Sequence, residues 1–316
     1  MNQGKDNRKS LESIALTGIM SVFFMFSIYY FEVLLFLFPV AFIAFGVKHD
    51  LFSSLLSLVT TLLIIGLLLS PAISLSYFLL FGPLIALSIY LIKKRTRANQ
   101  VVLYSALVLF IAILILLGIL NYNGVDLISQ FEEQFSMVLS GHLDYLKDMG
   151  FTTYELLETR DSLKSEYEKM MILIPAVILI TSSIISYINY QLITFGLKKV
   201  EIRILQLPRF LRFRLPDNFT IGALLMVVTA FFISMMNISY SDVLYVNIIV
   251  LLGSVLFLQG LAIVSFFLTK IKTKKFLRVI TYLIILFSPQ ISSIMALLGG
   301  IDIIFDLRKI KGAKSV

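Results

Sequence analysis

Long apolar segments, rich in Leu, Ile, Val and Phe, recur along the chain between Leu11 and Phe305, and most are 15 to 26 residues long. An α-helix rises about 1.5 Å per residue, so about 20 apolar residues cross the hydrocarbon core of a bilayer. Hydrophobic residues make up 59% of the chain and charged residues only 15%, whereas a soluble domain carries about 25% charged residues. The sequence therefore excludes a water-soluble protein and predicts an all-α fold, a polytopic transmembrane helix bundle.

The apolar segments divide into clear candidate spans and one ambiguous stretch. The clear spans are Leu11–Phe31, Val33–Val47, Leu51–Leu69, Ala72–Ile92, Val101–Asn121, Met171–Leu192, Asn218–Ile238 and Val243–Leu268. The second span is short and carries Pro39 at its middle, which predicts a broken helix. The stretch 276–306 contains Ser288-Pro289 and is long for one span but short for two. Because the basic tail beyond it favours the cytoplasm, we expect a terminal hairpin of two short helices, and about nine to ten spans in all.

The 27 Lys and Arg residues are distributed unevenly between the two sides that these spans define. If the N-terminus is cytoplasmic and the spans alternate, every one of them lies inside except Lys147, Arg160, Lys164 and Lys169. An excess of basic residues in cytoplasmic loops is the usual signal of membrane topology. We therefore predict that the N- and C-termini are both cytoplasmic.

Three regions follow from this topology. Residues 1–121 form an N-terminal five-span bundle, and residues 122–170 are extracytoplasmic. Residues 171–316 form a C-terminal bundle, which includes a basic cytoplasmic loop at 193–217 and the terminal hairpin.

The region 122–170 is the one sizeable polar segment, and acidic residues outnumber basic ones in it. Its apolar residues recur at helical spacing, which predicts an amphipathic helix. Gly150 can end this helix, and Thr152 with Glu155 forms a capping box for a second one. We expect an external helical pair that lies on the membrane, covers a central cavity or docks a partner.

The chain lacks the residues that several classes of function require. The chain has no Gly-rich phosphate loop, so it does not hydrolyse ATP by itself. It has no Cys, and its two histidines, His49 and His142, are predicted on opposite sides of the membrane. We therefore expect no enzyme, no metal site and no cofactor. The basic loops are expected to contact the anionic headgroups of the lipid bilayer rather than nucleic acid. The headgroup candidates are Lys198, Lys199, Arg203, Arg209, Arg212 and Arg214.

Polar side chains inside the spans are a better functional signal, because each needs an internal partner. Most buried amides join helices, but an amide such as Gln259, beside Gly260, can also build a ligand site. Asp302 and Asp306 share one helix face, with Arg308 just beyond, which favours either pairing with Arg308 or a proton or cation relay. The ligand or relay candidates are Gln259, Asn247, Asn189, Asp302, Asp306 and Arg308.

Small residues form a row on one face of the first span, which lets another helix approach closely. That helix can belong either to this chain or to a partner membrane protein. The residues of this packing or partner face are Ser13, Ala15, Thr17, Gly18 and Ser21.

The order of several short motifs resembles the YybS-like family of bacterial multi-pass membrane proteins, over most of the chain. The motifs are Pro39 followed by Gly46-Val47-Lys48-His49, Pro175 with Ser182 and Asn189, Leu207-Pro208-Arg209-Phe210, Arg214-Leu215-Pro216, Gln259-Gly260-Leu261-Ala262, and Gly300-Ile301-Asp302 through Asp306-Leu307-Arg308. The resemblance implies a protein of the bacterial cytoplasmic membrane. It implies no activity.

The first five spans are also similar, more weakly, to the substrate-binding S component of energy-coupling-factor transporters. The small residues Ala15 and Gly18 match the face where such components meet their transmembrane partner. The chain is much longer than an S component, and an S component requires separate ATPase subunits.

Two functional hypotheses remain. The first is a small-molecule permease or a substrate-capturing transporter subunit, with an unknown ligand. The second is a non-transporting scaffold of the cell envelope, in the manner of the cell-shape protein MreD, which docks partners on its basic and acidic faces. The first requires a polar ligand cavity between the spans, whereas the second does not.

Overall fold

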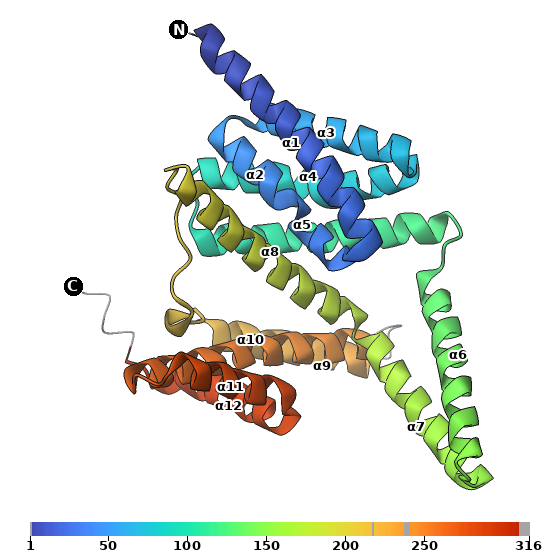
Figure 1. The fold of residues 1–316 in the computed structure, drawn as a ribbon. Coiled ribbons are helices and arrows are strands. Elements are labelled where there is room, and N and C mark those ends of the chain that lie inside the picture. The colour runs from blue at the N-terminus through green and yellow to red at the C-terminus, as the bar shows by residue number, and fades with distance from the viewer. Residues whose placement is uncertain (1, 217, 237–240, 310–316) are drawn as a thin grey trace. The chain divides into compact units, whose positions relative to one another are not determined.

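The computed structural model describes residues 2–216, 218–236 and 241–309, and every regular element within these ranges is a helix. Helices make up 86% of the structure, which confirms the all-α fold class. The α-helices in Figure 1 are α1 (Asn2–Tyr30), α2 (Phe38–Lys48), α3 (Leu51–Leu68), α4 (Pro71–Lys93), α5 (Ala98–Tyr122), α6 (Leu127–Asp148), α7 (Thr153–Ile172), α8 (Ile174–Lys199), α9 (Phe219–Met235), α10 (Ser241–Lys270), α11 (Lys275–Phe287) and α12 (Pro289–Phe305). The 3-10 helices are η1 (Glu32–Leu37) and η2 (Phe210–Arg212).

Six of the described helices are long and apolar enough to cross a membrane: α1 from Asn7, α3, α4, α5, α8 and α10. This confirms a polytopic helical membrane protein. The helices α11 and α12 pass the same test only as a pair, and they meet at a bend of 100° where Pro289 follows Ser288. The count of nine to ten crossings stays a prediction, because it depends on this pair, on the 17-residue α9 and on the short second span. The basic tail beyond Lys309 lies outside the described residues.

The short second span consists of two kinds of helix. η1 passes into α2 at Phe38, so Pro39 lies in the first turn of α2 rather than inside a continuous helix. Proline is tolerated there because its missing N–H has no intrahelical partner at that position. Placed end to end on one axis, the 6 residues of η1 and the 11 of α2 would reach about 28 Å. That length is close to the thickness of the hydrocarbon core, about 30 Å.

Contacts within the chain define two compact units. Unit 1 is Met1–Ser165 with Ile178–Leu207, and unit 2 is Glu166–Val177 with Pro208–Val316. Most of α8 therefore belongs with the N-terminal helices, whereas sequence analysis grouped it with the C-terminal bundle. The reason is packing, because Ile185, Ile193 and Leu197 of α8 are buried in the core of unit 1.

Aromatic side chains from α1, η1–α2 and α4 meet in the core of unit 1. The ring of Phe24 contacts Phe38 edge-on at 5.4 Å and Tyr77 at 4.7 Å between centroids. Edge-to-face pairs of this kind add about 0.5–1.5 kcal/mol each to the burial of their surface. The backbone of α2 also lies close to α4, since a Cβ on Gly46 would stand 2.2 Å from the Ile89 side chain.

Unit 2 is organised around a close crossing of α10 and α12. A Cβ added at Gly260 would lie 1.9 Å from the carbonyl oxygen of Met295, and one at Gly299 would lie 2.0 Å from that of Leu256. Two helices whose backbones approach this closely need glycine at the contact. The packing role expected of Gly260, next to Gln259, is thus present in unit 2.

The external helices α6 and α7 have the local structure that the sequence predicts. Asp126 caps α6 by accepting from the backbone N–H groups of Ile128 and Ser129. Thr152 N donates to Glu155 Oε2 at 2.8 Å, and Glu155 N donates to Thr152 Oγ1 at 3.4 Å, which is the expected capping box. No residue of α6 or α7, both of which are fully described, is buried.

Candidate functional site

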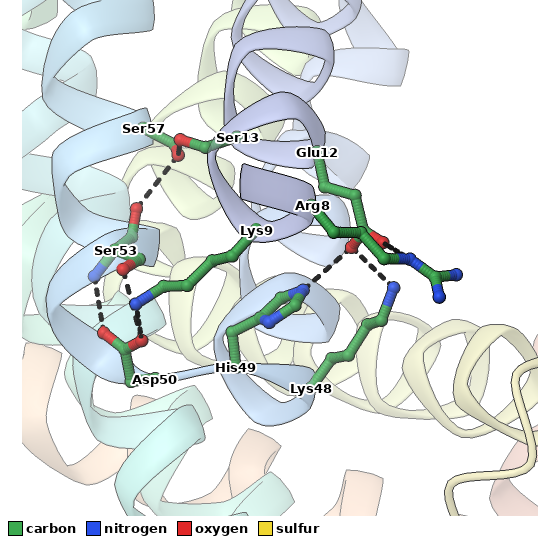
Figure 2. Close-up of polar contacts among 9 residues, drawn as sticks. All are labelled: Arg8, Lys9, Glu12, Ser13, Lys48, His49, Asp50, Ser53 and Ser57. Atoms are coloured by element: carbon green, nitrogen blue, oxygen red, sulfur yellow. Dashed lines mark hydrogen bonds and ion pairs between the residues drawn. The ribbon is translucent and has the colours of Figure 1, made fainter. Parts of the chain in front are cut away.

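An ionic cluster joins the N-terminal part of α1 to the turn between α2 and α3 (Figure 2). Glu12 is at its centre, because Oε2 accepts from Lys48 Nζ at 2.5 Å and contacts His49 Nε2 at 2.8 Å. Its second oxygen, Oε1, accepts from Arg8 Nε at 3.3 Å. Sequence analysis treated these cations as separate topology signals, whereas in unit 1 they fasten two segments together.

Asp50 is both an ion-pair partner and the N-cap of α3. Its Oδ1 accepts from Ser53 N at 2.8 Å, and its Oδ2 lies 2.5 Å from Lys9 Nζ (Figure 2). Burial acts to raise the pKa of Asp50, but the hydrogen bonds from Lys9 and Ser53 outweigh it and lower the pKa to about 2. The carboxylate is therefore charged at neutral pH, when it holds α1 against the start of α3.

The basic loops of unit 1 gather at one end of its helices. Lys93 Nζ, at the end of α4, donates to His49 O at 2.8 Å, next to the ionic cluster. Arg95 Nη1 donates to Arg203 O at 3.3 Å, which brings the segment after α8 to the α4–α5 turn. The segments predicted to be on the inner side therefore meet, as an alternating topology requires.

The small-residue row on α1 packs partly within its own chain. Ser13 Oγ hydrogen-bonds Ser57 Oγ at 2.6 Å, and Thr17 Oγ1 hydrogen-bonds Thr60 Oγ1 at 3.2 Å, both across to α3. Ser21 is buried and donates to Thr17 O. Ala15 and Gly18, which were expected to face a partner, are exposed, and nothing lies within 4 Å of the position of a Gly18 Cβ.

A buried ion pair connects α12 to the end of the described chain in unit 2. Arg308 donates to Asp302 Oδ2 through Nη2 at 2.8 Å and through Nε at 3.2 Å, and both side chains are buried. Gln259 Nε2 on α10 donates to the same Oδ2 at 2.7 Å. Pairing within unit 2, one of the two roles expected for this carboxylate, is the arrangement present.

The same network fastens the segment around η2 to α10 and α12. Arg308 donates to the carbonyl oxygens of Leu211 and Phe213 at 3.0 and 2.9 Å, while Leu215 N donates to Gln259 Oε1 at 3.1 Å. Arg214 Nη1 lies 3.3 Å from Asp306 Oδ1. Both polar atoms of the Gln259 amide therefore form hydrogen bonds within the protein.

Asn247 supplies the hydrogen bonds that the backbone lacks at the break between α7 and α8. Pro175 interrupts the backbone there, and Ala176 N donates to Asn247 Oδ1 at 2.8 Å. Asn247 Nδ2 donates to Ile172 O, the carbonyl that Ala176 N would reach in a continuous helix, and to Val243 O, both at 2.7 Å. Both polar atoms of Asn247 bond backbone groups of unit 2, so Asn247 is not a candidate ligand-binding residue.

Asn189 differs from these two amides. Its side chain is only 3% exposed, and neither Nδ2 nor Oδ1 has a hydrogen-bond partner. The buried hydroxyls of Ser182 and Ser186 lie on the same face of α8 at helical spacing and also have no partner. We call these three residues the α8 polar seam.

The wall opposite the seam is formed by α2, α4 and α5. Ser88 Oγ and Ser105 Oγ hydrogen-bond each other at 3.0 Å there, between α4 and α5. A small cavity of about 10 Å³ lies between this pair and the side chains of Ser186 and Asn189. That volume is about the size needed for one water molecule.

A hollow in unit 2 is chemically different. It is a groove of about 290 Å³ between α9 and α10, and Thr229 is its single polar lining residue. A groove with this lining suits apolar chains rather than a polar solute. Neither of these two hollows is the ligand-sized polar cavity that the permease hypothesis requires.

Most of the headgroup candidates have exposed side chains, and two of them contact other parts of the chain. Lys198 and Lys199 end α8 with exposed side chains, and Arg209 and Arg212 flank Phe210 with theirs. Two candidates contact other parts of the chain. The backbone oxygen of Arg203 accepts a hydrogen bond from Arg95, and the half-buried side chain of Arg214 pairs with Asp306.

Sequence reasoning named Asn189 but missed its neighbours Ser88, Ser105 and Ser186. The available signal was spacing, because Ser182, Ser186 and Asn189 repeat at four and three residues along one predicted span. Ser88 and Ser105 gave no such signal, since a lone serine in a span usually bonds its own helix backbone.

The comparisons with known proteins agree with the architecture. No curated protein and no solved structure matches the chain. Residues 16–303 match a family described as a predicted membrane protein, DUF2232, and this range includes all or part of every helix of both units. The chain therefore belongs to the DUF2232 family of predicted membrane proteins.

Proposed function

We propose that the protein is a membrane transport component that captures a small polar solute in unit 1, either as a permease or as the substrate-binding subunit of a larger transporter. The observation that carries the proposal is the α8 polar seam, where Ser182, Ser186 and Asn189 are buried without hydrogen-bond partners. A solute that donates and accepts hydrogen bonds would supply them.

Polar groups that are buried without a partner destabilise the solute-free protein. Each buried group without a partner costs about 1–3 kcal/mol, and the hydrocarbon core offers no bulk water as a substitute. Elsewhere the chain pairs its buried amides, since Asn247 and Gln259 bond protein groups on both polar atoms. Unpaired groups collected on one helix face are therefore typical of a binding site, where stability is lower before the ligand arrives.

We propose binding rather than catalysis. The described groups along the seam are hydroxyls and one carboxamide, which orient a solute through hydrogen bonds. Proton transfer at neutral pH needs a titratable group such as His, Asp or Glu within reach, and the seam residues are of other types.

The proposal is tested by native mass spectrometry of the full-length protein purified in detergent. The parent is expected to retain a non-lipid solute, and Asn189→Leu is expected to lose it. Gln191→Leu is the matched control, because Gln191 is an exposed amide on the same helix and donates to Tyr187 Oη. Identical spectra of bound solute for the parent and Asn189→Leu would overturn the proposal.

We further propose the bacterial cytoplasmic membrane as the location, with the basic end of unit 1 on the cytoplasmic side. The support is the positive-inside rule applied to the end where Arg8, Lys48, Lys93 and Arg95 gather. Exposed cations such as Lys199 would then contact anionic headgroups, with about 1 kcal/mol per residue near the surface.

A second candidate function, a docking scaffold, is favoured by α6. Ile128, Phe131 and Val138 on its apolar face are more than half exposed, at 59%, 58% and 71%. An apolar helix face that stays uncovered suits a partner protein or the membrane surface. Changing Phe131 and Val138 to Ser should release copurifying membrane proteins if α6 docks them, and an unchanged set of partners would remove this candidate.

A further inference from the structure

We infer that the ligand of the α8 polar seam is a neutral solute with hydroxyl or amide groups, and that it binds when α8 separates from α4 and α5. This inference rests on the proposed capture function and names its substrate class and its moving part.

The lining of the seam sets the charge of the ligand. Among the described residues that line the cavity, the polar ones are Ser88, Ser105, Ser186, Asn189 and Tyr190, and none of them carries a charge. An ion moved from water into such a site loses its hydration and gains no counter-charge, which is strongly unfavourable. A neutral solute avoids that cost.

The hydrogen-bonding groups of the seam set the chemistry of the ligand. Asn189 offers two N–H donors and a carbonyl acceptor, and each of the Ser182 and Ser186 hydroxyls both donates and accepts. Donors and acceptors therefore alternate along one helix face. Polyols, sugars and small amides present the same alternation, whereas an apolar solute would leave every one of these groups unpaired.

The size of the cavity requires a movement. About 10 Å³ lies between the walls, enough for one water and too little for a sugar or a small amide. A larger solute enters only if one wall moves outward.

The connections of the helices identify α8 as that wall. Short turns join α3 to α4 and α4 to α5, with Leu69 and Ser70 in the first of them. Between α5 and α8 the chain runs through the external helices α6 and α7, so α8 shares no tight turn with the opposite wall. Its outward displacement therefore stretches no short loop to α4 or α5.

The ligand class is tested with a bacterial metabolite extract separated by ion exchange into neutral, anionic and cationic fractions. Thermal unfolding of the whole detergent-purified protein is measured with each fraction. We expect the neutral fraction alone to raise the Tm of the parent and to leave Asn189→Leu unchanged.

Two serine variants provide a matched pair for the same assay. Ser186→Ala removes a seam hydroxyl and should raise the half-saturating concentration of the neutral fraction about fivefold. That change is equivalent to the loss of one neutral hydrogen bond of about 1 kcal/mol. Ser183→Ala removes an exposed hydroxyl that donates to Leu179 O on the same helix, and it should respond like the parent. Equal responses of the two variants would overturn the seam as the site.

The outcomes separate the two proposals. Stabilisation by a charged fraction that depends on Asn189 would refute the neutral class while the capture function stands. A bound water alone in the seam, with no fraction that stabilises the parent, would refute both.

The movement of α8 is tested by spin labels in this Cys-free chain. Labels at Ser183 on α8 and Leu103 on α5, both exposed, should show a shifted distance distribution when the neutral fraction is added. The control pair, Leu103 and Leu63 on α3, should not shift. An unchanged distance from α8 to α5, with ligand bound, would refute the movement.

Discussion

Replacing Asp302 with Asn tests the buried network of unit 2. Asp302 Oδ2 accepts from Arg308 at 2.8 and 3.2 Å and from Gln259 at 2.7 Å, and the side chains of the ion pair are 1% and 0% exposed. Asn has nearly the same shape but no charge, so the guanidinium of Arg308 would stay buried without a counter-ion. Breaking a buried pair in this way costs about 3–5 kcal/mol.

The expected readout is a lower Tm in detergent, by about 10 °C, since about 1 kcal/mol shifts the Tm by 2–4 °C in a domain of 150–250 residues. Asp306→Asn is the control, because its contact with Arg214 is longer, at 3.3 Å, and both side chains are partly exposed. The control should lower the Tm less than Asp302→Asn does, because its ion pair keeps partial access to solvent.

A double variant shows whether charge is the cause. Asp302→Asn combined with Arg308→Gln removes the stranded cation and should recover part of the lost Tm. Recovery stays partial, because the carbonyl groups of Leu211 and Phe213 lose the donors that Arg308 supplies. A Tm of Asp302→Asn equal to that of the parent would refute the buried pair.

Three further predictions use other parts of the chain. Gly260→Ala should lower the Tm in detergent by the equivalent of about 1–3 kcal/mol of overpacking, whereas Gly253→Ala on the same helix, with nothing within 4 Å of the added Cβ, should not; equal effects would contradict the close crossing. Asn189→Leu should raise the Tm of solute-free protein by the equivalent of about 1–3 kcal/mol, because it removes unpaired polar atoms; a lower Tm would mean that the amide is already satisfied. Single cysteines at Ser136 and Ser315 should react with an impermeant thiol reagent on intact cells only at the first position, and labelling of the second would contradict cytoplasmic termini.

Features that depend on local sequence could be predicted. The all-α class and the membrane location follow from apolar segment length, which is a property of each segment alone. The helix break at Ser288-Pro289 and the capping box of Thr152 with Glu155 follow from backbone chemistry within a few residues.

Features that depend on partners far along the chain could not be predicted. Asn189, Asn247 and Gln259 look alike in the sequence, as uncharged amides within apolar spans. Apart from Val243, which lies one helical turn from Asn247, their partners lie 40 or more residues away, as for Asn247 with Ala176 and Gln259 with Asp302. Helix rotation decides which amide meets a partner, and apolar periodicity in an almost wholly apolar span hardly constrains that rotation.

The assignment of α8 to unit 1 has the same origin. Sequence order places this helix after the external pair and beside the C-terminal spans, but burial of Ile193 and Leu197 places it with α2, α4 and α5. The candidate site was therefore visible in the sequence as one residue, Asn189, and its opposite wall was not.

The central claim is that the α8 polar seam holds a small polar solute, and an experimental density map of the protein purified without washing tests it most directly. We expect density larger than one water within hydrogen-bond distance of the Asn189 carboxamide and the Ser186 hydroxyl, with α8 displaced from Ser88 and Ser105. A closed seam that is dry or contains a single water, in protein purified from cells with its solutes retained, would contradict the claim.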